Sequence, residues 1–332
     1  MERIGVVGGG NWGTALGNLL AKKGHTVHIW AYEPDVVAGI NERHENPRYL
    51  QGVALHEGLV ATGDIYTAVC DAGVVVTVSP AQHVRATMTK AAQAMRPDAF
   101  VISASKGIEK STLCTMAEVL RAVLPPADTA FLSGPSFAIE VAHEQPTAVT
   151  VASETPRAAV RAQALFQTPY FRVYTSDDVV GVELGGALKN VIAVAAGMAA
   201  GLGLGHNAIA ALITRGLAEI ARLAEALGAN RLTLSGLAGM GDLILTCTGE
   251  LSRNRYVGVE LGRGRNIDDI LGGMDMVAEG VDTARATLAL SRRVGIEMPI
   301  VAEVHAVLFE GRTADAALEN LMLRQPKPEV WG

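Results

Sequence analysis

Arg3-Ile4-Gly5-Val6-Val7 leads directly into Gly8-Gly9-Gly10-Asn11-Trp12-Gly13 near the start of the chain. The glycines fit G-x-G-x-x-G at Gly8, Gly10 and Gly13. A helix-like pattern over 14–23 and a strand-like run over 26–30 follow, and Glu33 lies 20 residues after Gly13. Strand, glycines, helix, strand and acid in this order favour a dinucleotide site over a glycine turn in an ordinary β-α unit.

Each glycine of this loop has a separate physical task. Gly8 allows the tight turn, Gly10 lets the backbone approach a pyrophosphate, and Gly13 lets helix and strand pack closely. The free N–H groups at the start of the helix would then face the anion.

The composition indicates a compact protein of about two domains. The chain has 332 residues, 49% of them hydrophobic and 19% charged, with a formal net charge of −6. No Lys/Arg-rich tract is present, which argues against nucleic acid as a partner. The dispersed Cys70, Cys114 and Cys247 indicate free thiols, and no metal-binding spacing occurs. The first strand begins without a preceding leader pattern, so we expect a cytoplasmic protein.

One segment is long enough to cross a bilayer. Residues 190–214 contain no Asp, Glu, Lys or Arg. Gly and Ala dominate this segment, His206-Asn207 interrupts it, and no aromatic residues flank it. We therefore expect a helix buried in a soluble domain, in a protein that is not integral to the membrane.

The first half of the chain alternates strands with helices. Strand-like runs occupy 4–7, 27–30, 74–78, 100–103, 130–133, 148–151 and 171–174, and helical patterns cover 83–95 and 113–123. This alternation predicts an α/β, doubly wound parallel sheet of Rossmann type. The helical stretch 156–167 joins the last two strands, which we expect to pair at the sheet edge.

The second half is helical. Patterns of helical period cover 182–200, 208–227, 253–261, 282–294 and 300–309. The sequence therefore predicts a dinucleotide-binding domain over 1–180 and an all-helical, substrate-binding domain over 181–332. No flexible linker separates them, so we expect packed domains with a cleft between them.

Three segments of the helical half carry candidate chemistry. Lys189 lies in an apolar helical stretch, where burial would lower its pKa and a nearby carboxylate would raise it; it is either an acid/base or a structural lysine. Asp242 and Thr246 share a helix face, and Asp242 is either a partner of Lys189 or a helix cap. Ser252 is typical of an N-cap. The cations that follow it at 253 and 255 indicate a bound phosphate or a solvated arginine pair.

Two further segments follow strands of the expected sheet. Ser105-Lys106-Gly107 follows the run at 100–103, and Ser133-Gly134-Pro135-Ser136 ends the run at 130–133. Ligands bind at the carboxyl ends of strands in open α/β sheets, so both segments should face the cleft. The alternatives are a loop lysine at Lys106 and an N-cap at Ser136.

Together these segments resemble the soluble NAD(P)-dependent glycerol-3-phosphate dehydrogenases of bacterial type. The resemblance covers nearly the whole chain and keeps the family's order. It rests on seven stretches: Gly8–Ala15, Ser105–Gly107, Ser133–Ala138, Gly185–Val191, Gly239–Leu243 with Thr246–Thr248, Ser252–Asn254 and Val277–Gly280.

The resemblance implies a role for each matching residue. Lys189 would be the general acid/base, oriented by Asp242 and supported by Thr246, with Lys106 beside substrate and nicotinamide. The residues implied to bind substrate are Lys106, Gly134, Ser136, Lys189, Asn190, Asp242, Ser252, Arg253 and Asn254. Those expected at the cofactor are Gly8, Gly10, Asn11, Trp12, Gly13, Glu33, Tyr49, Lys106, Ala138, Arg253, Val277 and Glu279.

The resemblance also implies the reaction and the cofactors. Hydride from NADH or NADPH would reduce dihydroxyacetone phosphate to sn-glycerol 3-phosphate for phospholipid synthesis, with no metal. Many relatives prefer NADPH, whereas Glu33 favours a free ribose 2′-hydroxyl, so we expect NADH to be at least well tolerated. Arg43, Arg48 and Tyr49 could still cover the adenosine end.

Two other functions use similar sequence features. Other two-domain reductases act on hydroxy or keto acids, and a dinucleotide-binding regulator would show no turnover. The first would not need the phosphate cluster, and the second would need neither Lys189 nor Asp242. A homodimer is a reasonable expectation, since the helical half has abundant apolar surface to bury.

Overall fold

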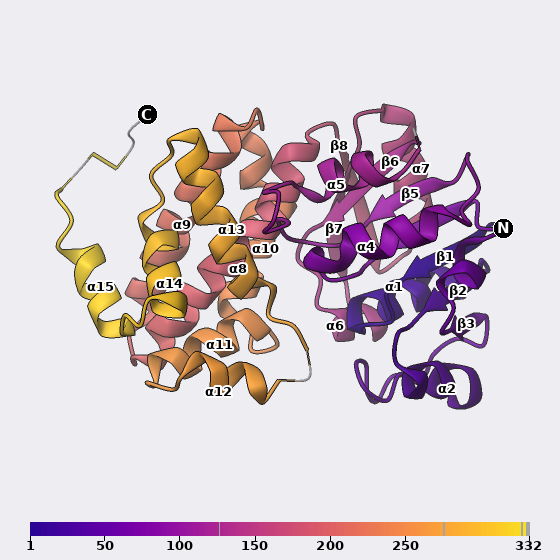
Figure 1. The fold of residues 1–332 in the computed structure, drawn as a ribbon, viewed down its shortest axis with the longest axis horizontal. Coiled ribbons are helices and arrows are strands. Elements are labelled where there is room, and N and C mark those ends of the chain that lie inside the picture. The colour runs from indigo at the N-terminus through magenta and orange to yellow at the C-terminus, as the bar shows by residue number, and fades with distance from the viewer. Residues whose placement is uncertain (126, 275, 327, 330–332) are drawn as a thin grey trace.

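The computed structural model describes residues 1–125, 127–274, 276–326 and 328–329. Figure 1 shows two halves side by side, a sheet covered by helices and a group of packed helices. The strands are β1 (Arg3–Val7), β2 (Thr26–Trp30), β3 (Leu59–Thr62), β4 (Val74–Thr77), β5 (Phe100–Ser103), β6 (Thr129–Ser133), β7 (Thr147–Ala152) and β8 (Phe171–Ser176).

Helices cover both faces of this sheet. They are α1 (Asn11–Lys22), α2 (Pro34–Arg43), α3 (Ile65–Val69), α4 (Ala81–Ala92), α5 (Met116–Val123), α6 (Ala138–Ala142) and α7 (Pro156–Phe166). Val74 and Val76 of β4 belong to the apolar cluster that contains α1, α6 and α7, and Val75 belongs to the cluster that contains α3, α4 and α5. Successive side chains of a strand point to opposite faces, so the sheet is buried on both sides.

The sheet has the order β3-β2-β1-β4-β5-β6-β7-β8. Strands β1 to β6 are parallel, as expected, whereas β7 runs antiparallel to β6. The five-residue helix α6 is only about 7.5 Å long, too short to carry the chain back across the sheet. β7 therefore starts at the edge where β6 ends. β8 is parallel to β7 through α7, which confirms the expected edge pair.

Strand β3 was not predicted from the sequence. It has four residues, lies at the sheet edge and pairs only with β2 among the described strands. Val60 within it is 43% exposed. A short, half-exposed strand gives too little hydrophobic pattern to recognise.

The second half contains no strand among its described residues, as the sequence predicts. Its elements are α8 (Val179–Gly201), α9 (His206–Ala226), η1 (Arg231–Ser235), η2 (Leu237–Gly241), α10 (Asp242–Thr248), α11 (Arg253–Gly262), α12 (Ile267–Gly272), α13 (Glu279–Val294), α14 (Pro299–Phe309) and α15 (Ala314–Met322). Helices α12 and α15 were not predicted from the sequence.

Helix α8 is the central helix of the second half. It is the one described helix that is long and apolar enough to cross a membrane, and 89% of its apolar window is buried within the protein. Its apolar character is therefore explained by core packing. The single buried helix expected over 190–214 is not formed, because α8 ends at Gly201, Gly203 turns the chain with a φ of +75° and α9 begins at His206. Residues 199–214 are half-buried or exposed. Two glycines let α8 pack closely against its neighbours: a Cβ on Gly186 would lie 2.4 Å from Ser133 Oγ of the first half, and one on Gly185 would lie 2.6 Å from the Ala238 carbonyl oxygen of η2.

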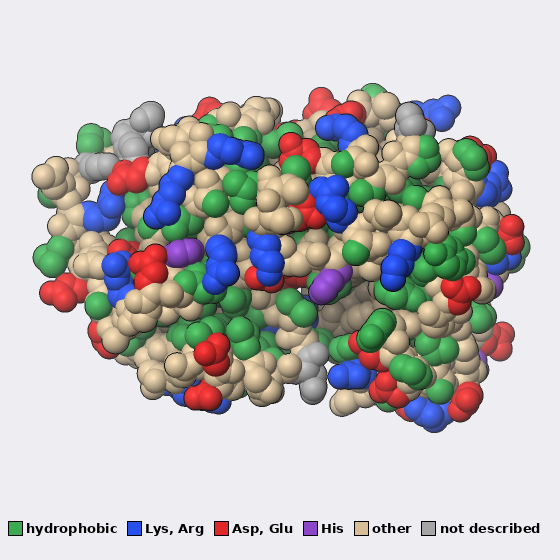
Figure 2. Space-filling view, in the orientation of Figure 1, with side chains coloured by type: hydrophobic (Ala, Val, Ile, Leu, Met, Phe, Trp, Pro, Cys, Tyr) green, Lys and Arg blue, Asp and Glu red, His purple; other side chains and the backbone are tan. Residues whose placement is uncertain are grey.

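This close approach positions the candidate site. Lys189 follows Gly186 by three residues, so it lies about one turn along α8 from the contact with β6. Acidic and basic side chains are interspersed over the face shown in Figure 2, and the surface is hollowed where the two halves meet.

Candidate active site

The glycine-rich loop joins β1 to α1. Gly8 has a φ of +128°, which favours glycine, and a Cβ on Gly13 would lie 1.9 Å from the Gly8 carbonyl oxygen. A Cβ on Gly10 would have no described neighbour within 4 Å. Gly10 is also the N-cap of α1 and offers no side chain to its first N–H groups. The loop therefore fits a pyrophosphate at the start of the helix.

Asn46 and Ala31 contact this loop, and neither was predicted from the sequence as part of the site. Asn46 is fully buried; its Nδ2 donates to the Gly9 carbonyl at 2.9 Å and to Thr14 Oγ1 at 2.8 Å. A Cβ on Gly9 would lie 2.5 Å from that of Ala31. Asn46 and Gly9 are 37 residues apart in the sequence, so no local sequence pattern predicts their contact.

Glu33 and Tyr49 lie together beyond the end of β2. The Tyr49 hydroxyl donates to Glu33 Oε1 at 2.7 Å, and Arg48 lies over the Tyr49 ring at 5.6 Å. Burial, together with the bond to Glu33, raises the pKa of Tyr49 to about 12, so the hydroxyl remains a donor at neutral pH. Arg43 pairs with Glu45 at 2.6 Å. A carboxylate held in this place suits a ribose hydroxyl.

The centre of the site is a carboxylate shared by two lysines. Lys189 of α8 bonds to Asp242 Oδ1, and Lys106 of the loop after β5 bonds to Asp242 Oδ2 at 2.6 Å. The Asp242 side chain is 1% exposed, and those of Lys189 and Lys106 are 8% and 17% exposed. Buried charges need such pairing.

Thr246 completes the surroundings of the Lys189 amine. It lies one turn after Asp242 on α10, accepts from Lys189 Nζ at 2.9 Å and donates to the Asp242 carbonyl at 2.6 Å. An ammonium has three donors. Among the described residues, Asp242 and Thr246 accept two of these N–H bonds. The third N–H is left for a ligand.

The geometry gives Lys189 a pKa suited to proton transfer. Burial lowers the pKa of Lys189 to about 8; the Asp242 carboxylate opposes this shift and the Lys106 charge adds to it. A group with a pKa near the working pH can both give and take a proton. The pairing of Lys189 with Asp242 is one of the two alternatives that the sequence left open, and the one that the resemblance implies. Asp242 is not the N-cap of α10, which is Gly241.

Lys106 also connects the site to β6. Its Nζ donates to the Gly134 carbonyl at 3.1 Å, and the Ser136 hydroxyl donates to the same oxygen at 3.0 Å. Both segments follow the carboxyl ends of their strands. The two loops expected at the cleft are therefore in contact.

The start of α11 forms the second part of the site. Ser252 caps the helix by accepting from the Arg255 N–H at 3.2 Å, as expected. Asn254 donates to Asn190 Oδ1 at 2.9 Å and accepts from the Gly280 N–H at 2.8 Å. This chain of bonds fixes α11 against both α8 and α13.

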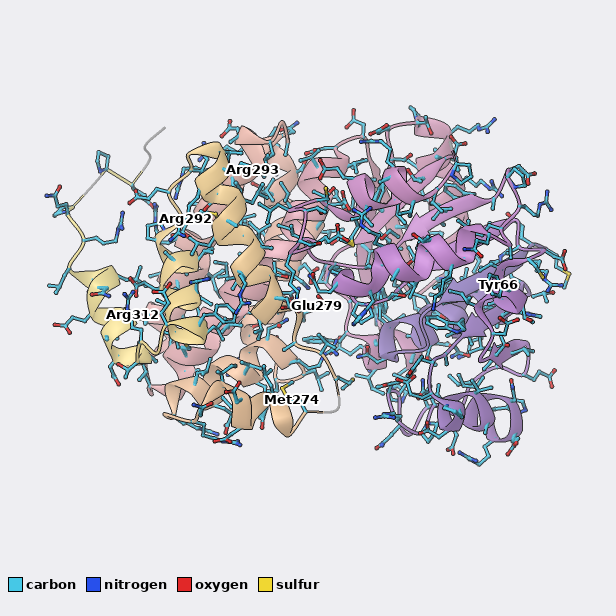
Figure 3. The ribbon with its side chains drawn as sticks, viewed as in Figure 1. Tyr66, Met274, Glu279, Arg292, Arg293 and Arg312 are labelled. Carbon is cyan, nitrogen blue, oxygen red and sulfur yellow. The ribbon has the colours of Figure 1, made fainter. Side chains whose placement is uncertain are left out.

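Arg253 and Glu279 lie near each other at the junction of the halves. Burial lowers the pKa of Arg253, and the charge of Glu279 opposes the shift. Glu279 Oε1 accepts from the Ala81 N–H, at the start of α4, at 3.1 Å, and burial raises the pKa of Glu279 to about 7. Figure 3 shows Glu279 where α13 begins, facing the first half. Glu279 is therefore only partly ionised at neutral pH, and its charge lies near Arg253.

The remaining candidates lie around these groups. Ala138 is buried as the first residue of α6, and Val277 is 49% exposed just before α13. Asn11 Oδ1 accepts from the Trp12 N–H at 2.8 Å. Trp12 Nε1 is buried with no partner among the described residues, which leaves a donor for a ligand beside the glycine loop.

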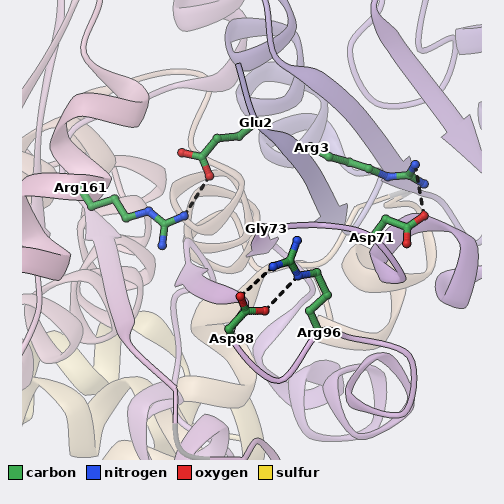
Figure 4. Close-up of a pocket in the computed structure, with 7 residues that line it drawn as sticks. All are labelled: Glu2, Arg3, Asp71, Gly73, Arg96, Asp98 and Arg161. Carbon is green, nitrogen blue, oxygen red and sulfur yellow. Dashed lines mark hydrogen bonds and ion pairs between the residues drawn. The ribbon is translucent and has the colours of Figure 1, made fainter.

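A separate hollow lies at the opposite edge of the sheet. It is lined by Glu2, Arg3, Asp71, Gly73, Arg96, Asp98 and Arg161 (Figure 4). Each arginine is paired with a carboxylate there, at 2.7 to 3.4 Å. The hollow lies at the amino ends of the strands, and its charged side chains bind one another. We therefore do not assign a ligand to it. No group of three or more His, Cys, Asp or Glu that could hold a metal occurs among the described residues.

The fold and site define a class of protein. A glycine loop at the first β-α turn of a parallel sheet, facing a helical domain that carries a buried lysine–carboxylate pair, defines a two-domain nicotinamide-dependent dehydrogenase. The models for the NAD-dependent glycerol-3-phosphate dehydrogenase N-terminus and C-terminus match residues 3–159 and 178–319. The chain therefore belongs to the NAD-dependent glycerol-3-phosphate dehydrogenase family.

Individual relatives agree with this family. The chain is 55% identical over 331 residues to glycerol-3-phosphate dehydrogenase [NAD(P)+] of Geobacter metallireducens, covering 99% of each. It is 53% identical to the Myxococcus xanthus protein of the same name, again covering 99% of each. The crystal structure of glycerol-3-phosphate dehydrogenase from Coxiella burnetii matches with a TM-score of 0.94 at 37% identity, covering 97% of this chain and 99% of that one.

A more distant likeness concerns the fold alone. A ketopantoate reductase from Ralstonia eutropha matches with a TM-score of 0.60 at 18% identity, over 95% of this chain and 99% of that one. The two-domain plan thus extends beyond the family.

Proposed function

We propose that this chain interconverts dihydroxyacetone phosphate and sn-glycerol 3-phosphate with NADH or NADPH, and so supplies glycerol phosphate for phospholipid synthesis. The observation that carries the proposal is the buried Lys106–Asp242–Lys189 cluster beside the basic start of α11. A ketone needs a proton donor, and a phosphate needs a cation and free N–H groups.

The cofactor would lie along the carboxyl edge of the sheet. Gly8, Gly10 and Gly13 would admit the pyrophosphate, and Glu33 and Tyr49 would meet the adenosine ribose. The nicotinamide end would approach Lys106, Ala138, Arg253 and Glu279, with Asn11, Trp12 and Val277 along the way. Bound there, the reduced nicotinamide supplies a hydride to the carbonyl carbon of the substrate.

The residues of this chain would manage the proton and the charge. Lys189 uses its free N–H to donate to the substrate carbonyl oxygen and transfers the proton as the alkoxide develops. Lys106 stabilises the same negative charge. Asp242 and Thr246 orient the Lys189 amine. In the reverse direction, neutral Lys189 takes the proton of the alcohol.

The phosphate would fix the substrate at a distance from the reacting carbon. Arg253 and Asn254 bind its oxygens together with N–H groups at the start of α11, which Ser252 caps. Asn190, Gly134 and Ser136 complete the substrate site. Phosphate binding of this kind orients the ketone for reaction.

The pKa of Lys189 sets the pH dependence. Reduction needs the protonated amine, which is present below pH 8 and lost as the pH rises through about 8. Oxidation of the alcohol needs the neutral amine and should rise over the same range. Values of kcat/KM for the substrate in both directions, measured across this range, check the expectation, because they follow the pKa of the enzyme without substrate. Two profiles that bend in the same direction would contradict it.

Glu33 should allow NADH and disfavour NADPH. A carboxylate beside the ribose accepts from the 2′-hydroxyl and repels a 2′-phosphate. We expect Glu33→Gln to raise kcat/KM for NADPH roughly 10-fold, because it removes this repulsion. The gain should be no larger, because the Glu33 charge is half-exposed and partly screened by solvent. The NADH value should change little.

The control for this cofactor prediction is Tyr49→Phe. It removes the hydrogen bond to Glu33 and keeps the carboxylate charge, so NADPH should remain disfavoured. A strong preference of the unchanged protein for NADPH would contradict the prediction.

The organisation of the protein belongs to the same proposal. We place the dinucleotide-binding domain at 1–180 and the helical domain at 181–332, close to the start of α8 at Val179. We propose a cytoplasmic homodimer that binds no nucleic acid. Sedimentation equilibrium of the purified protein tests the dimer.

A decisive assay compares substrates. Dihydroxyacetone phosphate should be reduced rapidly, and dihydroxyacetone without its phosphate should react far more slowly. Equal rates with both compounds would favour a reductase of another substrate class. Cofactor binding without turnover would favour a regulator.

A further inference from the structure

The loop after β5 contacts both halves of the molecule through successive residues. In Figure 1 the chain between β5 and α5 reaches across to α13. The Ser105 hydroxyl donates to the Ser79 carbonyl at 2.6 Å, and the Lys106 amine reaches Asp242 in the helical half. Gly107, with a φ of +153°, packs so closely that a Cβ would lie 2.5 Å from that of Ala81.

Ile108 crosses the boundary between the halves. It comes from the sheet half but is 0% exposed, and it belongs to the apolar cluster of the helical half. The same cluster includes residues of α8, α10 and α13. Complete burial of an isoleucine side chain stabilises the contact that it makes. Ile108 therefore attaches the loop to the domain that carries Lys189 and Asp242.

Glu109 attaches the same loop to the sheet half. Its carboxylate is bonded to Arg85 of α4 at 2.7 and 2.9 Å and is also bonded to Thr112. The Glu109 side chain is 6% exposed. Gln82, also on α4, donates to the Ile108 carbonyl at 2.9 Å and accepts from the Lys110 N–H at 3.0 Å. The Arg85 side chain is 35% exposed, so only the carboxylate of this two-point ion pair is buried. Together with the additional bonds, the pair holds the backbone in one place.

We propose that Ile108 and Glu109 are positioning residues that hold the Lys106 amine against Asp242, by attaching its loop to the helical domain and to α4 respectively. The loop has no regular secondary structure, and Lys106 has a long, flexible side chain. The two attachments, two and three residues beyond Lys106, replace the rigidity that a helix or strand would supply. This inference rests on the proposed reaction for its kinetic consequences.

The consequence for Lys189 is electrostatic. The titratable groups around its amine are Asp242 and Cys247 of α10 and Lys106 of the loop. On α11, Arg255 lies near Cys247 and Arg253 near Glu279. Burial is the main cause that lowers the pKa of Lys189, and the Lys106 charge lowers it further. If the loop is released, Lys106 moves away and the pKa of Lys189 rises.

The test is Ile108→Ala, with Ile220→Ala as the matched control. Ile220 is 1% exposed in the same apolar cluster, but it lies on α9, which receives none of the hydrogen bonds of the loop given above. We expect Ile108→Ala to lower kcat about 10-fold, with KM for NADH within about twofold. The pH midpoint of reduction should move upward by about 0.5–1 unit. Ile220→Ala should reduce stability without moving the midpoint.

Two further variants keep the test decisive. Ile108→Val should restore most of kcat, and Glu109→Gln, which keeps the side-chain shape, should move the midpoint in the same direction as Ile108→Ala. If Ile108→Ala does not fold, these two variants carry the test. Unchanged midpoints in folded Ile108→Ala and Glu109→Gln, or an equal shift in Ile220→Ala, would overturn the proposal.

A double variant identifies Lys106 as the intermediary. Lys106→Met alone should raise the midpoint, and adding Ile108→Ala to it should raise the midpoint no further. Additive shifts would show that Ile108 acts by another route.

A readout without turnover separates this inference from the proposed reaction. The pKa of the Lys189 amine can be followed by NMR of protein labelled with ¹⁵N at lysine Nζ, with the signal assigned from Lys189→Met. A rise of that pKa in Ile108→Ala supports the inference even if dihydroxyacetone phosphate proves not to be the substrate. An unchanged pKa overturns it even if the reaction is as proposed.

Discussion

Replacement of Lys189 by alanine should lower kcat for the reduction of dihydroxyacetone phosphate on the order of 10³-fold, within the range for loss of a general acid. The amine is the group bonded to both Asp242 and Thr246, and it has one donor left for the substrate. Alanine supplies neither the proton nor the charge. Steady-state rates with saturating cofactor and substrate measure the loss.

The control for this experiment is cofactor binding. The glycine loop and the Glu33–Tyr49 pair lie on other elements, so NADH should still bind Lys189→Ala with nearly unchanged affinity, measured by quenching of protein fluorescence. Circular dichroism checks the fold. A folded variant that keeps near-normal turnover would show that another group donates the proton.

Replacement of Arg253 by alanine should lower kcat/KM for dihydroxyacetone phosphate by roughly 10²- to 10³-fold, the cost of removing one partner of a buried charged pair. Its guanidinium lies at the start of α11, beside Glu279. The slow reaction of dihydroxyacetone should change far less, because that compound has no phosphate. The discrimination between the two substrates would then largely disappear.

Arg255→Ala is the matched control for Arg253→Ala. Arg255 lies in the same first turn of α11, and its backbone N–H bonds to Ser252 whatever its side chain. Its replacement should leave the discrimination between the two substrates intact. An equal loss of kcat/KM for dihydroxyacetone phosphate in both variants would indicate a general effect of charge. If Arg253→Ala loses kcat/KM equally with both substrates, the phosphate must bind elsewhere.

Much of the fold could be predicted because its signals are local. The glycine loop, the alternation of strands and helices, and the change to helical periods after Gly181 all lie within short windows of sequence. Strand β3 could not be recognised, because four residues at a sheet edge, of which only Leu59 and Ala61 are buried, are too few to show a clear period. The reversal of β7 depends on the shortness of α6, which the sequence does not mark.

The site likewise has parts that could be predicted from the sequence and parts that could not. Lys189 was visible as a charge in an apolar helix, and Asp242 and Thr246 as two polar residues one turn apart. The sharing of Asp242 by two lysines was not visible, because Lys106 and Asp242 are 136 residues apart. The contacts of Asn46 with the glycine loop and of Ile108 with the helical core are also long-range packing events, and nothing near them in the sequence indicates them.

The measurement that tests the central claim most directly is the absorbance of the reduced nicotinamide. Purified protein is mixed with dihydroxyacetone phosphate and either NADH or NADPH. We expect rapid decay that depends on the substrate, and a rate with NADH at least comparable to that with NADPH. No decay with either cofactor, from folded protein that binds NADH, would contradict the assignment of this chain as a glycerol-3-phosphate dehydrogenase.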